Sequence, residues 1–279
     1  MLKQRIITAL VLVAFLLPAL AAPRVWPFAV LTLLLIGTAG WEWARLNGVA
    51  GGAALALGVL LAALCAAALL GGLADVPPPP LIWWSALLIW VLGGALVLRG
   101  GPEVWPRIVP AARLATGLAL LWTAWLALTA AKTIGVNLIL STFCLVWAAD
   151  IAAYFGGRAF GKHKLAPAIS PGKSWEGVWS GMLGALALAA FWLWLDTILK
   201  MDSLSLYLRL YMRFGAIGLI GMVVFLCAVS VVGDLFESLV KRSAGAKDSS
   251  ALLPGHGGVL DRVDALLPVF PIAMALLTV

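Results

Sequence analysis

Long apolar runs separated by short polar segments form the main pattern of this sequence. A helix needs about 20 apolar residues to cross the roughly 30 Å of hydrocarbon in a bilayer, and several of these runs reach that length without a charged residue. The pattern therefore predicts an all-α polytopic integral membrane protein with about nine transmembrane helices. The predicted spans are approximately 5–22, 26–45, 51–73, 81–98, 110–131, 134–155, 177–199, 214–240 and 263–279.

The polar residues gather in the second half of the chain. Residues 1–131 have few polar side chains, whereas residues 132–279 contain two charged loops. We therefore treat 1–131 as an N-terminal transmembrane region and 132–279 as the region that carries the candidate chemistry. In the first region Glu42 lies near the end of a span, three residues before Arg45. This spacing puts both side chains on one helix face and predicts an ion pair at the membrane interface.

The composition also indicates a membrane protein. The chain is 63% hydrophobic and 11% charged, against about 45–50% and about 25% in soluble globular domains. The net charge of +7 comes without a long basic run, so we expect no nucleic-acid partner. Cys65, Cys144 and Cys227 lie in apolar spans without a CxxC pattern, which argues against a disulfide or metal role. The first run follows Lys3 and Arg5, as in a signal peptide, but leads directly into the next span, so we expect an uncleaved helix.

The distribution of Lys and Arg predicts the orientation in the membrane. With a cytoplasmic N-terminus, most of the 19 basic residues fall in cytoplasmic segments, as the positive-inside rule requires. Both charged loops, 156–176 and 241–262, then lie on the cytoplasmic face, where they could build one site. The basic residues left for the outer side are Arg24, Lys132, Lys200, Arg209 and Arg213.

The first charged loop follows Asp150, a carboxylate inside the sixth span. A carboxylate in that position is costly and usually faces a wet cavity or a partner, and Tyr154 shares its helix face. Ser174 is a candidate N-cap for the next helix, whose N-terminus could hold an anion. The loop either binds phosphate or touches anionic lipid headgroups. Arg158, Lys162, Lys164 and Lys173 supply the positive charge of this loop.

Two pairs of carboxylates flank the second charged loop. Asp234 and Glu237 are three residues apart, as are Asp261 and Asp264, so each pair lies on one helix face. Crowded carboxylates repel one another unless a cation relieves them, and Mg²⁺ takes one or two carboxylates together with substrate phosphates. The pattern predicts a magnesium site for phosphates, with internal salt bridges as the alternative. The candidate phosphate-binding cations are Lys241, Arg242, Lys247 and Arg262.

A glycine-rich turn, Pro254-Gly-His-Gly-Gly, lies between the two carboxylate pairs. Gly257 and Gly258 allow unusual dihedral angles and let backbone N–H groups approach a ligand. His256 either donates a hydrogen bond to phosphate or holds the turn. His163 is expected to be solvated, and the spacing of the two histidines is not that of a zinc site.

The second loop resembles the signature of a known family. The residues Ser238-x-Val-Lys-Arg, Lys247-Asp248 and Leu253-Pro-x-His-Gly-Gly-Val-x-Asp-Arg-Val-Asp264 are similar to those of the phosphatidate cytidylyltransferases, also called CDP-diglyceride synthases. Upstream, Asp150, Tyr154-Phe-Gly-Gly-Arg and Ser170-Pro-Gly-Lys resemble the same family. The first half of the chain resembles it only in being hydrophobic.

The resemblance implies transfer of the cytidylyl group of CTP to phosphatidic acid, which gives CDP-diacylglycerol and pyrophosphate for phospholipid biosynthesis. It also implies Mg²⁺ dependence with a metal pair at Asp234 and Asp261, whose second ion is monovalent or divalent. A homodimer in the bacterial inner membrane, with its active site facing the cytoplasm, is implied as well. The implied catalytic residues are Asp234, Asp261, Lys173, Lys247, Asp248 and His256. The implied substrate-binding residues are Arg158, Ser170, Ser174, Ser238, Lys241, Arg242, Gly257, Gly258 and Arg262, and the implied metal ligands are Asp234, Asp261 and Asp264.

Other functions fit parts of the pattern. A CTP-dependent polyprenol kinase would belong to the same superfamily and accept a different lipid. A polytopic transporter would also need polar residues at helix ends, but the charges gather on one face of the membrane and no internal repeat indicates inverted halves. A CDP-alcohol phosphotransferase would need a DGxxAR core, which the sequence lacks.

Overall fold

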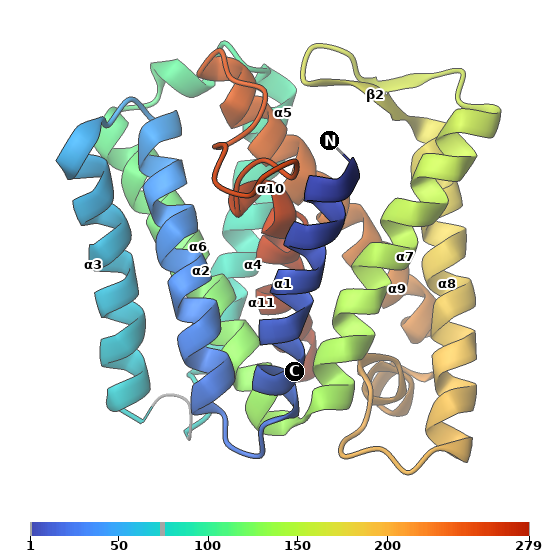
Figure 1. Ribbon diagram of the computed structural model, residues 1–279. Coiled ribbons are helices and arrows are strands. Elements are labelled where there is room, and N and C mark those ends of the chain that lie inside the picture. The colour runs from blue at the N-terminus through green and yellow to red at the C-terminus, as the bar shows by residue number, and fades with distance from the viewer. Residues whose placement is uncertain (1, 73–75, 279) are drawn as a thin grey trace.

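The chain folds into a bundle of apolar helices, seen in a computed structural model that describes residues 2–72 and 76–278 (Figure 1). Two short antiparallel strands form a hairpin at one end of the bundle. The elements are α1 (Leu2–Ala21), α2 (Trp26–Leu46), α3 (Gly51–Leu70), α4 (Pro80–Leu88), η1 (Ile89–Gly93), α5 (Gly94–Gly100), η2 (Trp105–Arg107), α6 (Pro110–Ile134), α7 (Val136–Phe160), β1 (Lys164–Ala166), β2 (Ser170–Ser174), α8 (Trp175–Ile198), α9 (Leu206–Ser243), α10 (Leu260–Val263) and α11 (Leu266–Thr278).

The predicted all-α polytopic membrane protein is confirmed. Within the described residues, seven helical segments are long and apolar enough to cross a membrane: α2, α3, the continuous α4–η1–α5 segment, α6, α7, α8 and α9. The apolar parts of α1 and α11 are shorter. Helix α11 begins later than the predicted span 263–279 because α10 and a charged turn occupy the residues before it.

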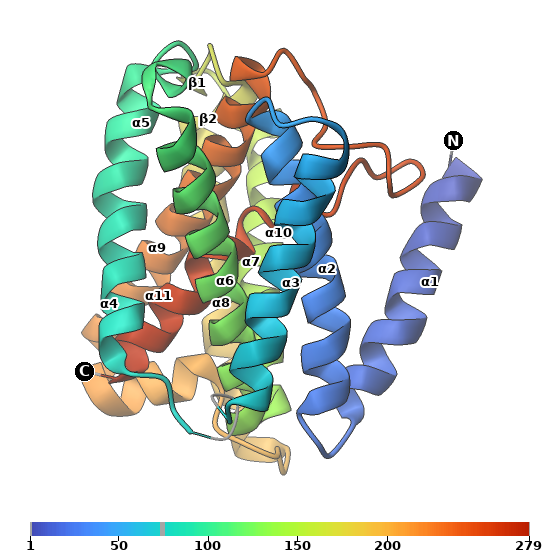
Figure 2. The same cartoon turned by 90° about the vertical axis from the view of Figure 1, so that its left-hand side faces the viewer.

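Both charged loops lie at the same end of the bundle (Figures 1 and 2). We call this the polar end: it holds the β1–β2 hairpin, the C-terminal end of α9 and the loop 244–259. The start of α1 lies toward this end, and the end of α11 lies toward the opposite one. The predicted convergence of the two charged loops is therefore present in the fold.

Small residues let the helices that carry the site approach closely. A Cβ at Gly181 of α8 would lie 2.8 Å from the backbone oxygen of Ala149 on α7, so only glycine fits at this crossing. Small residues at helix contacts compensate for the missing hydrophobic drive between helices in lipid. The close contact holds α7 against α8, and the β1–β2 hairpin connects the two helices.

Three tryptophan rings pack around Phe236 of α9. The ring of Phe236 lies 6.0 Å from Trp43, 5.5 Å from Trp90 and 5.2 Å from Trp105, measured between ring centroids. Edge and offset contacts of this kind stabilise by about 0.5–1.5 kcal/mol each beyond the buried area. Helices of the N-terminal region therefore position the segment of α9 that carries Asp234 and Glu237.

Helix α9 begins at Leu206, earlier than the predicted start at 214. The polar residues Arg209 and Arg213 interrupt the apolar run there, so hydropathy alone missed the first turns. Gly215, with φ +68° and ψ −173°, breaks the helix between this short first part and the long second part. Glycine adopts such a positive φ without steric cost.

Asp202 caps α7 at the end opposite the polar end. Its carboxylate accepts hydrogen bonds from the backbone nitrogens of Val136, at 2.6 Å, and Asn137, at 3.0 Å. Partial burial alone would raise the pKa of Asp202, but these hydrogen bonds outweigh it and lower the pKa below its usual value. The ionised carboxylate therefore stabilises the fold.

We expect Asp202→Ala to lower the free energy of unfolding at neutral pH by about 0.5–2 kcal/mol, the range for loss of a helix cap. Because the pKa is lower in the folded state, this stabilisation is present above the unfolded-state pKa of about 3.9 and is lost as the pH falls through the folded-state value. Thermal unfolding in detergent across pH measures it, with Lys200→Ala on the same exposed loop as control. A difference between wild type and variant that persists unchanged at acid pH would contradict this role.

Candidate functional site

The first charged loop is a helix end followed by a β-hairpin. The predicted loop 156–176 is corrected, because α7 continues to Phe160 and β2 leads directly into α8 at Trp175. Ser174 is the predicted N-cap, and its Oγ accepts from the nitrogen of Gly177 at 3.2 Å. His163 is exposed but not free, since its Nδ1 lies 2.6 Å from Glu176.

A cavity of about 400 Å³ lies between α7, α8, β2 and α9. Apolar side chains such as Val178 and Val231 form part of its wall. Pockets of this volume suit small ligands when a few polar groups converge on an apolar lining. The polar and charged residues that line it are Asp150, Tyr154, Arg158, Lys173, Ser174 and Asp234.

Lys173 connects the hairpin to α9. Its Nζ lies 2.5 Å from Asp234 Oδ2, and Ser238 Oγ donates to Asp234 Oδ1 at 3.4 Å. Asp150 lies close enough to interact electrostatically with both Lys173 and Asp234. The structure thus brings the predicted residues Lys173, Asp234 and Ser238 together.

Lys241 joins the end of α9 to α10. Its Nζ lies 2.5 Å from Glu237 Oε2 and 2.5 Å from Asp261 Oδ1, and all three side chains are largely buried. Lys241 was predicted to bind phosphate, but here its charge is taken up by carboxylates, as in the salt-bridge alternative. Close, desolvated charge pairs of this kind hold a fold mainly because removing one partner is costly.

Asp261 organises the second loop. Its Oδ2 accepts hydrogen bonds from Ser249 N and Oγ, both at 2.9 Å, and from Gly258 N at 2.8 Å. Burial alone would raise the pKa of Asp261, but the hydrogen bonds from Lys241, Gly258 and Ser249 outweigh it and lower the pKa to about 2. The carboxylate is therefore ionised at neutral pH.

Asp264 links the two lysine-centred groups. It interacts electrostatically with Asp234, Lys241 and Lys173, and its Oδ1 accepts from the nitrogen of Ala265 at 2.8 Å. A Cβ at Gly233 would lie 2.5 Å from the backbone oxygen of Asp264, so glycine permits this approach. Burial, and then the carboxylate of Asp234, raise the pKa of Asp264 above its usual value.

The donor chemistry of this network fits a hard divalent cation. The described residues include no group of three His, Cys, Asp or Glu side chains already placed to hold an ion. However, the carboxyl groups outnumber the ammonium groups that contact them, and all of the candidate donors are oxygens. Mg²⁺ prefers such oxygen ligands, and Asp234, Asp261 and Asp264 are the residues that could hold it.

The glycine-rich turn is held by its own backbone. Leu253 N donates to Gly257 O at 2.8 Å, and Gly257 has a φ of +82°, which favours glycine. Arg262 donates from Nε to the backbone oxygen of His256 at 2.9 Å, so it supports the turn. The Nδ1 atom of His256 is buried without a hydrogen-bond partner among the described residues.

The predicted residues Ser170, Arg242, Lys247 and Asp248 do not line the cavity. Arg242 donates to the backbone oxygen of Ala246 at 3.2 Å and lies 3.4 Å from that of Ile169, which ties α9 to the hairpin. Ser170 lies on β2, paired with Ala166. Lys247 and Asp248 are exposed.

Glu42 does not form the ion pair predicted for it at the membrane interface. The carboxylate is fully buried and does not pair with Arg45, whose guanidinium stacks over Trp41 at 4.8 Å. Glu42 instead accepts hydrogen bonds from four groups of the segment 249–260. The missed signal was a carboxylate inside an otherwise apolar span, which is costly without a partner.

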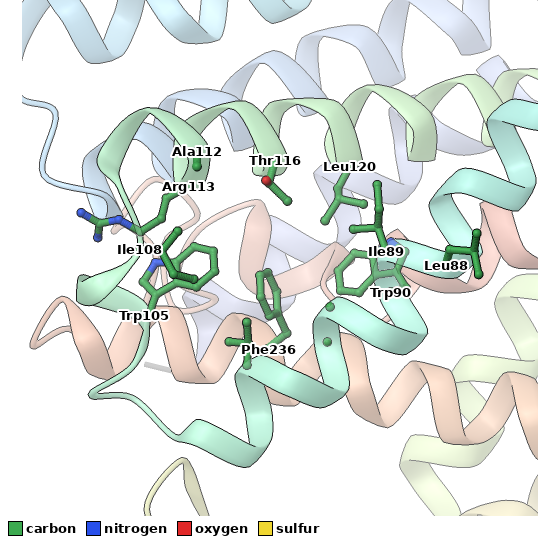
Figure 3. A pocket seen from close by; sticks show the side chains of 13 residues that line it. Leu88, Ile89, Trp90, Trp105, Ile108, Ala112, Arg113, Thr116, Leu120 and Phe236 are labelled. Atoms are coloured by element: carbon green, nitrogen blue, oxygen red, sulfur yellow. The ribbon is translucent and has the colours of Figure 1, made fainter.

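A second cavity, of about 430 Å³, lies on another side of α9 (Figure 3). The rings of Trp90, Trp105 and Phe236 and the aliphatic side chains of α4 and α6 line it, with Arg113 at one end. The predicted site residues do not line this cavity. The candidate site is therefore the charged cavity between α7, α8, β2 and α9.

Comparison with known proteins gives a consistent match. A model described as the cytidylyltransferase family matches residues 3–279. A phosphatidate cytidylyltransferase of Pseudomonas aeruginosa is 42% identical over 286 residues, which cover 99% of this chain and 97% of that protein. A phosphatidate cytidylyltransferase of Haemophilus influenzae is 50% identical over 137 residues, 49% of this chain and 44% of that protein. Phosphatidate cytidylyltransferase 5, chloroplastic, of Arabidopsis thaliana is 42% identical over 156 residues, 55% of this chain and 35% of that protein.

We expect Lys241→Met to destabilise the fold by about 3–5 kcal/mol, because it leaves the buried carboxylates of Glu237 and Asp261 without their counter-ion. Thermal unfolding in detergent micelles measures the loss. The double variant Lys241→Met/Glu237→Leu removes one uncompensated charge and should recover part of the stability. Lys247→Met, at an exposed lysine of the same loop, is the matched control. If Lys241→Met unfolds at the same temperature as the wild type, the contacts of Lys241 with Glu237 and Asp261 are not needed for stability.

Proposed function

The chain belongs to the cytidylyltransferase family, and we propose that it transfers the cytidylyl group of CTP to phosphatidic acid, giving CDP-diacylglycerol and pyrophosphate. The observation that carries this proposal is the network around Lys173, Asp234 and Asp264 beside a cavity at the polar end of a membrane bundle. A water-soluble nucleotide and a membrane lipid can both reach a site at that position.

The cavity offers complementary surfaces to the two substrates. Arg158 and Lys173 supply positive charge for phosphate groups, and Val178 and Val231 give apolar wall between membrane helices. Guanidinium and ammonium groups bind phosphate through charge-assisted hydrogen bonds. A lipid whose phosphate reaches Lys173 would keep its acyl chains against the apolar part.

The chemistry needs no nucleophile from the protein. A phosphate oxygen of phosphatidic acid, ionised at neutral pH, attacks the α-phosphorus of CTP. The bond between that phosphorus and the bridging oxygen to the β-phosphorus breaks, and pyrophosphate leaves with the electron pair. In this proposal Lys173 and Arg158, which line the cavity, orient the phosphates and offset their charge. Catalysis then rests on positioning and electrostatic stabilisation.

We further propose that Asp234, Asp264 and Asp261 hold Mg²⁺ and that a second cation, monovalent or divalent, binds with it. Asp261 would bind through its Oδ1, in exchange for the contact of that oxygen with Lys241. The excess of carboxyl groups over ammonium groups supports this proposal. A bound divalent ion supplies positive charge to the phosphates. Lys173 would then exchange part of its contact with Asp234 for a phosphate of the substrate.

The other residues implied by the family resemblance stay predictions. Lys247, Asp248 and His256 remain candidate catalytic residues on the second loop, and Ser170, Ser238, Arg242, Gly257 and Gly258 remain candidate substrate contacts. Lys241 and Arg262 act on substrate only by leaving the protein groups that they contact.

The orientation and assembly of the chain are also proposals. We propose a homodimer in the bacterial inner membrane, with the N-terminus and the active site facing the cytoplasm. The asymmetric distribution of Lys and Arg supports this orientation, and the fold places both charged loops at one end.

Purified wild-type protein in detergent should form CDP-diacylglycerol and pyrophosphate from CTP and phosphatidic acid. We expect Asp234→Asn to lower kcat by about 10²–10³-fold, the scale on which preorganised charge stabilisation acts. Asp202→Asn, a carboxylate at the opposite end, is the control and should keep wild-type kcat.

The products separate this proposal from its alternatives. A CTP-dependent lipid kinase would release CDP rather than pyrophosphate. Release of CDP would reject the proposed reaction. A near-wild-type kcat in Asp234→Asn would reject the role of Asp234.

The orientation can be tested with single cysteines. In a chain whose native cysteines are replaced, Ala251→Cys at the polar end should react with an impermeant thiol reagent only in inverted membrane vesicles. Met201→Cys at the opposite end should react only from outside the cell, since the two positions lie in exposed loops at opposite ends. The reverse pattern would overturn the orientation.

A further inference from the structure

We propose that Glu42 is a positioning residue for the site: it fixes the segment 249–260 and, through Ser249, the carboxylate of Asp261. This inference rests on the proposed function for its kinetic consequence. Its structural basis is a set of hydrogen bonds between α2, in the N-terminal region, and the second charged loop.

The carboxylate of Glu42 is fully used by the loop. Oε1 accepts from Ser250 Oγ at 2.6 Å and from Val259 N at 3.0 Å. Oε2 accepts from Ser249 Oγ at 3.2 Å and from Leu260 N at 2.7 Å. The side chain is 0% exposed. Because every contact is with the protein, Glu42 acts on the site through the loop and does not touch substrate.

Ser249 connects Glu42 to Asp261. Its Oγ lies 3.2 Å from Glu42 Oε2 and 2.9 Å from Asp261 Oδ2, so the two carboxylates share its single hydroxyl hydrogen. Its nitrogen donates to the same Asp261 oxygen at 2.9 Å. A displacement of Ser249 therefore moves two of the donors that hold Asp261. Ser250 has no such link, since its Oγ contacts Glu42 and the nitrogen of Leu252.

Gly258 shows how closely the three groups are packed. A Cβ at this position would meet the Oγ of Ser249 and the Oε1 of Glu42 at less than van der Waals distance. Gly258 also donates its N–H to Asp261 Oδ2 at 2.8 Å. The two adjacent glycines thus have different roles: Gly257 provides a positive φ, and Gly258 leaves room for Glu42.

Glu42→Gln isolates the charge and hydrogen bonding from the size of the side chain. Each carboxylate oxygen accepts one hydroxyl and one backbone N–H. A hydroxyl can rotate to accept from the new amide, but a backbone N–H cannot reverse. In either orientation the amide NH₂ of glutamine therefore faces Val259 N–H or Leu260 N–H, and one buried donor loses its partner.

The experiment combines hydrogen–deuterium exchange with steady-state kinetics on the full chain in detergent. In Glu42→Gln we expect faster exchange at Val259 and Leu260, which Glu42 binds, and also at Ser249 and Gly258, which bind Asp261. We expect kcat for cytidylyl transfer to fall at least about tenfold, which is the rate factor that corresponds to the free energy of one buried hydrogen bond to a charged group. The KM for CTP should change less.

Two serine variants form a matched pair. Ser249→Ala removes the hydroxyl that lies between Glu42 and Asp261 and should reproduce the fall in kcat. Ser250→Ala removes a hydrogen bond to the same carboxylate without touching Asp261 and should keep kcat within about twofold of wild type. The pair decides the question even if Glu42→Gln fails to fold.

Three outcomes would overturn the proposal. One is faster exchange at Val259 and Leu260 with Ser249 and Gly258 still protected. A second is wild-type kcat in Glu42→Gln or Ser249→Ala, which would leave Glu42 a merely structural residue. The third is an equal loss of kcat in both serine variants. If wild-type protein shows no cytidylyl transfer, the proposed function fails, and the exchange experiment still tests the coupling of Glu42 to Asp261.

Discussion

Charged groups buried at one end of an apolar bundle have to be compensated by other groups of the protein, because a carboxylate removed from water without a partner costs several kcal/mol. The polar end meets this constraint with two lysines, each of which contacts a carboxylate on another element. Lys173 reaches from β2 to Asp234 on α9, and Lys241 joins Glu237 to Asp261. These contacts also set the position of α10 and the turn before α11, so the electrostatic requirement and the geometry of the site have one cause.

The N-terminal region contributes to the site although it carries few polar residues. Three tryptophan rings pack around Phe236, which lies two residues after Asp234 on α9: those of Trp43, Trp90 and Trp105. Glu42, one residue before Trp43, binds the loop that contains Ser249. The end of α2 therefore supports α9 by apolar packing and the loop by hydrogen bonds. A division at residue 131 describes the distribution of polar residues along the chain better than it describes their contacts.

The same network leaves some groups available for ligands. Asp261 has both carboxylate oxygens engaged by the protein, whereas Asp234 is held mainly by Lys173 and a long contact from Ser238. Asp234 lines the cavity together with Arg158. Within the proposed reaction, Asp261 is therefore the more rigid member and Asp234 the more adjustable one. This difference follows from the number of donors around each carboxylate.

The sequence by itself determined the membrane class, the approximate helix spans, the N-cap at Ser174 and the clustering of charge, because each depends on residues close together along the chain. It also carried the family resemblance through the residues from Ser238 to Asp264. Only the tertiary structure decided that Lys241 binds carboxylates, that α9 starts at Leu206, and that Glu42 binds Ser249, 207 residues away. Those outcomes depend on which helix ends meet in the folded bundle. Local hydropathy and spacing do not contain that information, since a buried charge takes its partner from whichever element packs against it.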